Sequence, residues 1–127
     1  MMDNTDLVNI LHQFCKEYDV DISKVSIEFD NEIMTDEHTL GTTYHHTDYV
    51  NHCYFSVIFI NNHLSKLPLS CRSTVWHEFC HAEKWVKEHV MDGHGIEFQK
   101  RVYRKPLLGF YSEVVSRIIW VFVRLRY

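Results

Sequence analysis

Two histidines and a glutamate near the middle of the chain have the residue types and the spacing of a catalytic zinc site. Residues 77–81 read His77-Glu78-Phe79-Cys80-His81, which is the pattern HExxH. Residues i and i+4 of a helix project from one face, so His77 and His81 can bind the same Zn²⁺ ion. Zinc acidifies a water molecule, and Glu78, offset around the helix, can take its proton as general base. The pattern predicts the hydrolysis of peptide bonds.

A third zinc ligand is expected downstream of the motif, because a catalytic zinc usually has three protein ligands and keeps a fourth position for water. His94 follows within DGHG (92–95), whose glycines are expected to let the backbone turn sharply back towards the helix. Glu113 is the alternative, because some HExxH enzymes take a glutamate from a following helix. An ion pair with Arg117, four residues further along, would equally explain Glu113. We predict His94 as the ligand.

The motif could also arise by accident, because the chain has ten histidines. The surrounding helix argues against this, since its apolar residues fall on one narrow stripe at about 100° per residue. His77 and His81 lie nearly opposite that stripe, which consists of Val75, Phe79, Ala82 and Val86. The two histidines are therefore expected to face a cleft, although simple exposure to solvent would give the same pattern.

The elements that must position these residues can be predicted from local patterns. Apolar residues at helical spacing predict a helix over 6–18, capped by Asn4 or Thr5. Alternation over 25–29 predicts a half-buried strand, and residues 40–46 and 53–60 predict a hairpin. The motif itself lies in a predicted helix over 70–89.

Two helices are expected after the motif. A short helix over 95–104 ends near Pro106, and a final amphipathic helix carries Arg117 and Arg124 on its polar face. The apolar face of that final helix consists of Tyr111, Val114, Val115, Ile118, Phe122 and Leu125. We expect this face to pack on the core rather than to lie on a membrane surface.

The composition indicates one domain over residues 1–127. With 46% hydrophobic residues, the 127-residue chain can bury one core. No basic leader precedes the first acidic residues, and the longest apolar run, 118–123, is far shorter than the roughly 20 residues of a membrane span. We expect a cytoplasmic protein. The four cysteines form no CxxC pair, so we expect reduced, mostly buried thiols rather than a zinc ribbon or a redox site.

The charge of the chain is unevenly distributed. Residues 1–99 carry 6 Lys and Arg against 16 Asp and Glu, whereas residues 100–127 carry 7 against one, Glu113. A basic terminal segment of this kind can contact nucleic acid, an acidic membrane surface or the acidic body of its own chain.

Three stretches together resemble the SprT-like metallopeptidases, a family that includes the Spartan proteases of DNA–protein crosslinks. They are FINNHL (59–64), TVWHEFCHAEKWV (74–86) and DGHGIEF (92–98), and the likeness covers residues 40–104. HExxHA followed by a short loop and HGxxF is more specific than HExxH alone. The resemblance implies an α+β, zincin-like fold, in which a small antiparallel sheet packs against the HExxH helix and flanking helices. It also implies zinc ligation by His77, His81 and His94, general-base catalysis by Glu78, and proteolysis, with DNA-associated proteins as one substrate class.

The chain departs from many members of that family, which continue into a four-cysteine zinc ribbon or a separate DNA-binding region. DNA contact would here depend on the basic segment alone, and so compact a form would suit a protein of a phage or mobile element. Two other functions stay open, namely a non-catalytic zinc module for interaction and a nucleic-acid-binding module stabilised by zinc. Glu78 argues against the first, and the acidic body argues against the second. Tyr44, Tyr103 and Tyr111 could each stabilise an oxyanion, and none is singled out.

Overall fold

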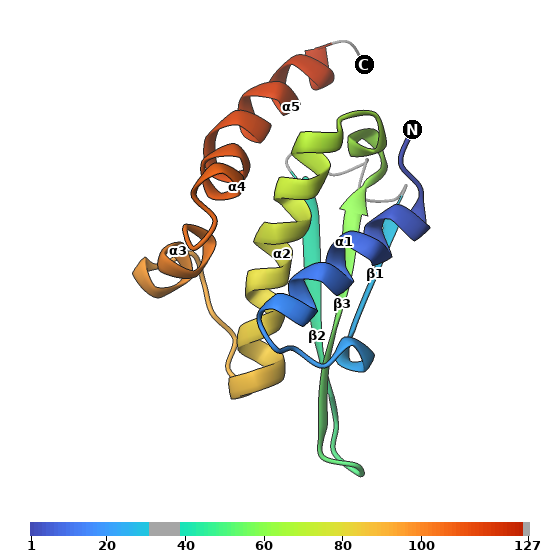
Figure 1. Ribbon diagram of the computed structural model, residues 1–127, viewed down its shortest axis with the longest axis vertical. Helices are drawn as coiled ribbons and strands as arrows, with labels where there is room; N and C mark the ends of the chain where they lie inside the picture. Colours follow the sequence, from blue (N-terminus) through green and yellow to red (C-terminus); the bar gives the residue numbers. More distant parts are fainter. Residues whose placement is uncertain (31–38, 126–127) are drawn as a thin grey trace.

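The structure, a computed structural model, describes residues 1–30 and 39–125, with side chains apart from those of Trp120 and residues 122–125. Figure 1 shows a mixed α and β architecture with one small sheet and helices packed around a central helix, α2. The elements in chain order are α1 (Asn4–Glu17), η1 (Ile22–Lys24), β1 (Val25–Asp30), β2 (Gly41–Asp48), β3 (Cys53–Asn61), η3 (Asn62–Lys66), α2 (Pro68–Glu88), α3 (Ile96–Val102), α4 (Pro106–Phe110), η4 (Tyr111–Val115) and α5 (Ser116–Leu125).

The predicted helices and strands are present, with ends that differ by a few residues. Helix α1 begins two residues earlier than predicted because Asp3, rather than Asn4 or Thr5, is its cap. The Asp3 side chain accepts a hydrogen bond from the backbone N–H of Asp6, and the Asp6 side chain accepts one from Asp3 in return. This capping box satisfies backbone donors that the first helical turn leaves open.

The sheet is mixed rather than antiparallel, which corrects the prediction for one of its two strand pairs. Its order is β1-β3-β2, with β2 antiparallel to β3 and β1 parallel to β3. The alternation of apolar residues shows which face of a strand is buried but not the direction of its neighbour, so the sequence pattern could not distinguish the two arrangements. Strand β2 lies at an edge of the sheet, and β3 lies in the middle.

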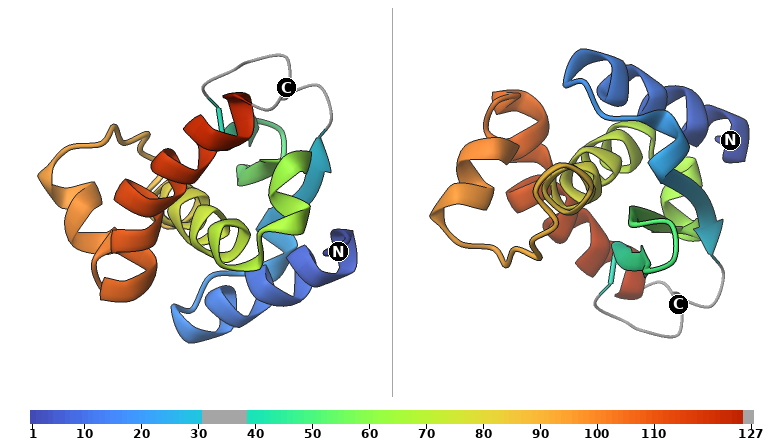
Figure 2. Two further views of the ribbon diagram at one scale, coloured as in Figure 1. Left: turned by 90° about the horizontal axis from the view of Figure 1, so that it is seen from above. Right: turned by 90° about the horizontal axis from the view of Figure 1, so that it is seen from below.

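Helix α2 lies between the sheet and the C-terminal helices (Figure 2). It packs against β3 and β2 on one side, α1 on another, and α3, α4 and η4 on a third. Trp76 is fully buried and donates its indole N–H to the carbonyl oxygen of Val102, 2.7 Å away, which ties α2 to the end of α3. The predicted stripe of α2 is buried at Val75, Phe79 and Ala82, but the C-terminal helices cover much of its other side as well.

The C-terminal helices form one helical segment that packs differently from the prediction. Its apolar residues are largely exposed, namely Leu107, Phe110, Val114, Ile118 and Val121. The residues it buries are small, Gly109, Ser112 and Ser116, and the hydroxyl of Ser116 lies 3.1 Å from that of Ser73 on α2. The π-helical turn η4 adds a residue to one turn and rotates the faces that a regular α-helix would present. The predicted packing of the apolar face is therefore wrong for Val114 and Ile118, whereas Tyr111 and Val115 are half-buried. Phe122 and Leu125 lie outside the described side chains.

No helix in the described ranges is both long and apolar enough to cross a bilayer. The four cysteines are free, and three of them, Cys15, Cys71 and Cys80, are buried as predicted.

Candidate metal centre

The structure brings the three predicted ligands together from two elements. His77 and His81 lie one turn apart on α2, and His94 lies in the loop between α2 and α3. The Nε2 atom of His94 is 3.2 Å from Nε2 of His77 and 3.2 Å from Nε2 of His81. Together the three side chains form a group that could hold a metal ion.

In each of the two histidines of α2, Nδ1 is hydrogen-bonded to a carboxylate. Nδ1 of His77 lies 2.7 Å from Oε1 of Glu113, and Nδ1 of His81 lies 2.9 Å from Oδ1 of Asp92. Because an ionised carboxylate can only accept, each Nδ1 carries the proton and donates it. Glu113 stays ionised, since the hydrogen bond from His77 lowers the pKa of its carboxyl group. This arrangement, in which a carboxylate orients an imidazole from behind, is typical of metal-binding histidines.

The convergent nitrogens fit a zinc ion. A tetrahedral zinc with Zn–N bonds of about 2.0–2.1 Å has nitrogen ligands about 3.3–3.4 Å apart, close to the 3.2 Å separations here. With Nδ1 protonated, His77 and His81 both present an unprotonated Nε2 to His94. A proton on His94 could satisfy one of those lone pairs but not both, whereas a cation between the three rings satisfies all of them.

Desolvation favours the neutral form of two of the imidazoles, which is the form that binds a metal. Desolvation, with a further contribution from His77, lowers the pKa of His81 to about 3. Desolvation also lowers the pKa of His94, again with His77 acting in the same direction. A metal ligand must be deprotonated, so these shifts favour metal binding near neutral pH.

Glu113, the alternative ligand, lies behind His77 rather than among the convergent nitrogens. It comes from the π-helical turn η4, and its second oxygen, Oε2, is 4.0 Å from Nη2 of Arg117. Glu113 therefore contacts the histidine cluster through His77 and also lies close to Arg117, which agrees with part of each role considered from the sequence. Of the two candidates, His94 is therefore the one whose Nε2 converges with those of His77 and His81, while Glu113 contacts Nδ1 of His77.

Glu78 lies beside the three histidines without joining them. Its Oε2 atom is 4.0 Å from Nε2 of His77, and its side chain is almost fully buried. Burial, partly offset by His77, raises the pKa of the Glu78 carboxyl group. Thr43, on the edge strand β2, lies with its hydroxyl 3.2 Å from Oε1 of Glu78. A fixed carboxylate with a raised pKa is suited to accept a proton near neutral pH.

Two residues of α3 contact the cluster: Phe98 contacts the histidine rings, and Arg101 contacts the partner of His81. The Phe98 ring stacks on His81 at 4.1 Å between centroids and meets His77 and His94 edge-on. Arg101 forms an ion pair with Asp92, the residue that holds His81. Asp92, Thr43 and Arg101 were not predicted as site residues, and only Asp92 had a sequence signal, its place beside His94.

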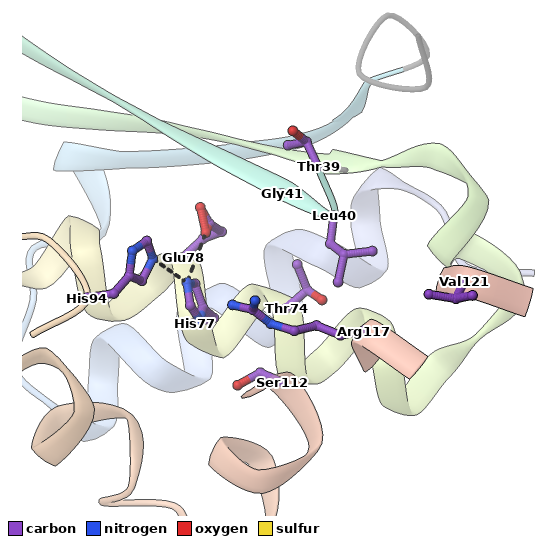
Figure 3. A pocket seen from close by; sticks show the side chains of 10 residues that line it. All are labelled: Thr39, Leu40, Gly41, Thr74, His77, Glu78, His94, Ser112, Arg117 and Val121. Carbon is purple, nitrogen blue, oxygen red and sulfur yellow. Dashed lines mark hydrogen bonds and ion pairs between the residues drawn. The ribbon is translucent and has the colours of Figure 1, made fainter. Parts of the chain in front are cut away.

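A cavity of about 440 Å³ opens beside the histidines (Figure 3). Its wall includes His77, Glu78 and His94, and continues to the start of β2 and to the C-terminal helical segment. The remaining lining residues are Thr39, Leu40, Gly41, Thr74, Ser112, Arg117 and Val121. Glu78 and two of the three histidines therefore line one cavity, whereas His81 is not among its lining residues.

One expectation about residues around the site, the role of the glycines beside His94, needs correction. Neither Gly93 nor Gly95 has a positive φ, and an added Cβ at either would meet nothing within 4 Å, so the loop does not depend on glycine to return His94. None of the three tyrosines considered for the oxyanion lines the cavity that holds Glu78. Tyr103 borders a second, shallower cavity with His94, and Tyr44 is more than half exposed.

Much of the basic C-terminal segment is paired with the acidic body of the chain. Arg104 forms an ion pair with Glu83, 2.6 Å away, and Lys105 forms one with Glu17 at 2.8 Å. Arg101 pairs with Asp92, as described above. These pairs favour the internal explanation of the charge asymmetry. The side chains of Arg124 and Arg126 lie outside the described part.

Comparison with known proteins gives one match. The model of the SprT-like family matches residues 6–106, a range that contains His77, Glu78, His81 and His94. Glu113 and Arg117 lie beyond the matched range. Searches of curated proteins and of solved structures found no match. Because the family match spans well over half of the chain, the protein belongs to the SprT-like family.

Proposed function

We propose that this protein is a zinc-dependent peptidase in which His77, His81 and His94 hold the metal and Glu78 is the general base. The observation that carries the proposal is the convergence of three Nε2 atoms, since that of His94 lies 3.2 Å from those of both His77 and His81. The buried carboxylate of Glu78 lies 4.0 Å from Nε2 of His77. Three histidine ligands leave a fourth position on a tetrahedral zinc, which is the ligand set of a catalytic rather than a structural site.

Each residue of the site would have a separate role in hydrolysis. Zinc, when bound, would lower the pKa of a water molecule and polarise the carbonyl group of the substrate. Glu78 would take the proton of the water at Oε2, because Thr43 holds the other oxygen, Oε1. The same carboxylic acid would then donate this proton to the leaving amine. Glu113 and Asp92 would keep Nε2 of His77 and His81 aimed at the metal throughout.

The alternatives have less support from the geometry. A zinc module without catalysis has no use for a buried carboxylate beside the ligands and a cavity of about 440 Å³ open to them. A function in nucleic-acid binding rests on the basic segment, and in the described residues at least four of its seven cations pair with acids of the same chain. DNA-associated proteins therefore remain one substrate class suggested by family resemblance, with no contact in the described residues that favours it.

The test separates the metal from the base. Purified wild-type protein and the Glu78→Gln variant are compared for zinc content and for cleavage of unfolded casein. Both should hold one zinc per chain, while cleavage by the variant falls by about 10²-fold or more, the scale of a lost general base. Equal cleavage by the two proteins, or wild-type protein that holds no zinc, would refute the proposal.

A further inference from the structure

The cavity beside the histidines holds a cation that the proposed chemistry does not use. We infer that Arg117 binds a carboxylate of the substrate there, either the side chain of an aspartate or glutamate or the C-terminal carboxylate of a peptide. The inference rests on the proposed peptidase function and adds a substrate class to it, namely peptides that present a carboxylate near the cleaved bond.

The position of Arg117 places its charge at the cavity wall opposite the sheet edge. Arg117 lies in the first turn of α5 and lines the same cavity as His77, Glu78 and His94. In Figure 3 its side chain runs along the cavity, with the guanidinium end turned towards His77. Among the ten described residues of the lining, Arg117 is the one arginine or lysine.

The charge of Arg117 is weakly engaged, in contrast to the other paired arginines of the C-terminal segment. Within the described residues its ion pair is with Glu113, at 4.0 Å, and its side chain is 65% exposed. Glu113 gives its other oxygen to His77 at 2.7 Å, so its position is determined by the histidine. Arg104, in comparison, makes contacts of 3.1 and 2.6 Å with the two oxygens of Glu83. The guanidinium donors of Arg117 are therefore available to a ligand.

The chemistry of the wall favours a carboxylate at this end of the cavity. A guanidinium group presents a planar fork of N–H donors that matches the two oxygens of a carboxylate. Leu40, Thr74, Ser112 and Val121 are neutral residues of the same lining. Glu78 would repel a carboxylate that moved towards the catalytic end, so the acidic group would be held near α5 while the peptide bond lies at the histidines.

The binding test uses zinc-loaded Glu78→Gln protein, which binds substrate without cleaving it. The probes are short alanine peptides in three forms: one with a central glutamate and an amidated end, one with a central glutamine and an amidated end, and one of alanine alone with a free C-terminal carboxylate. Isothermal titration calorimetry should give at least one of the two carboxylate peptides an affinity about tenfold above that of the glutamine peptide. The peptide that shows the gain identifies the source of the carboxylate.

Two further substitutions in the Glu78→Gln background assign the preference. Arg117→Gln should abolish the gain, whereas Lys100→Gln, which removes an exposed charge outside this cavity, should leave it unchanged. A gain that persists in Arg117→Gln would mean that the metal binds the carboxylate, and would overturn the inference. Equal binding of all three peptides, or no binding by any, would overturn it too.

Cleavage by proteins with Glu78 intact separates this inference from the proposed function. In a digest of a mixed peptide library, wild-type protein should favour sites close to a carboxylate, and Arg117→Glu should favour sites close to a lysine or arginine. Cleavage without an acidic preference would refute the role of Arg117 and leave the peptidase standing. If binding depends on Arg117 but the wild-type protein cleaves nothing, the role of Arg117 stands and the proposed peptidase function is refuted.

Discussion

Oε1 of Glu113 lies 2.7 Å from Nδ1 of His77, although 36 residues separate the two in the chain. The contact joins the π-helical turn η4 to the helix of the HExxH motif. It fixes which nitrogen of His77 carries the proton, and so leaves Nε2 free for a metal. The C-terminal segment therefore contributes to the site even though none of the three histidines comes from it.

Removing that carboxylate should weaken zinc binding without abolishing it. We expect Glu113→Ala to lower zinc affinity by about 10–100-fold, the range for the loss of such a supporting group. Glu113→Gln should lose less, because an amide oxygen can still accept the hydrogen bond from His77. Competition with a chromophoric chelator measures the affinities. Glu97, whose side chain is 83% exposed, provides the matched control through Glu97→Ala. A loss far beyond 100-fold would indicate that Glu113 binds the metal directly.

The buried His81 should make the metal-free protein sensitive to acid. Its pKa is about 3 in the folded chain, mainly because of desolvation, against about 6.5 when unfolded. The unfolded state therefore binds an extra proton between these two values. The contribution of His81 to the free energy of unfolding is complete above about pH 6.5 and is lost as the pH falls towards about 3. The free energy of unfolding then falls with a limiting slope of about 1.4 kcal/mol per pH unit.

Urea unfolding in the presence of a chelator, at a series of pH values between about 4 and 7, measures this slope. His81→Gln should reduce it by up to one proton relative to wild type, whereas substitution of the exposed His12 should leave it unchanged. Burial lowers the pKa of His45 in the same direction, but that contribution is common to all three proteins. Identical slopes for His81→Gln and wild type would contradict the assignment.

The sequence identified the three histidines that the structure brings together better than the groups that contact them. His77, Glu78 and His81 are recognisable because their spacing matches one helical turn, and His94 because it follows closely. The contact of Glu113 with His77 depends on the register of a π-helical turn, which apolar periodicity does not reveal. Thr43 reaches Glu78 only because β2 lies beside α2.

The fold shows the same division between local and non-local information. Helices and strands follow from periodicity, so their positions were predicted within a few residues. The parallel pairing of β1 with β3 is a relation between segments about thirty residues apart, and neither segment carries a signal for its direction. The packing of the C-terminal helices through Gly109, Ser112 and Ser116 was missed because apolar residues, which here face outwards, dominate such patterns.

The four cysteines should differ sharply in their reactivity. Burial raises the pKa of Cys15 to about 11 and those of Cys71 and Cys80 to about 12. Cys53, at the start of β3, is only half-buried, and its Sγ lies 2.8 Å from the ammonium group of Lys24. The thiolate is the reactive form, so iodoacetamide at about pH 8 should modify Cys53 first in the native protein and all four thiols in urea. Mass spectrometry counts the adducts, and rapid native labelling of a second cysteine would show that the core is less closed than described.

Gly41, the first residue of β2, should be required for the placement of Glu78. A Cβ at this position would lie 2.9 Å from Cγ2 of Thr74 and 3.0 Å from Cγ of Glu78, closer than normal packing allows. The backbone of Gly41 does not have a positive φ, so alanine is compatible with its conformation and the effect would come from the contacts alone. We therefore expect Gly41→Ala to move the sheet edge and the Glu78 carboxylate apart.

The variant should bind zinc like wild type, since no ligand is touched, but cleave substrate at least about tenfold more slowly, with a loss of stability of about 1–3 kcal/mol from overpacking. Gly93→Ala is the matched control, because its Cβ would meet nothing within 4 Å. Zinc content, thermal unfolding of the zinc-loaded proteins and cleavage of unfolded casein are measured for both. If Gly41→Ala is unfolded at room temperature, Gly41→Ser, which carries the same Cβ, should be unfolded as well. The contacts around Gly41 would then explain stability only, and not catalysis. If Gly41→Ala is folded, holds zinc and cleaves as fast as Gly93→Ala, the close approach of β2 to Glu78 is not needed for catalysis.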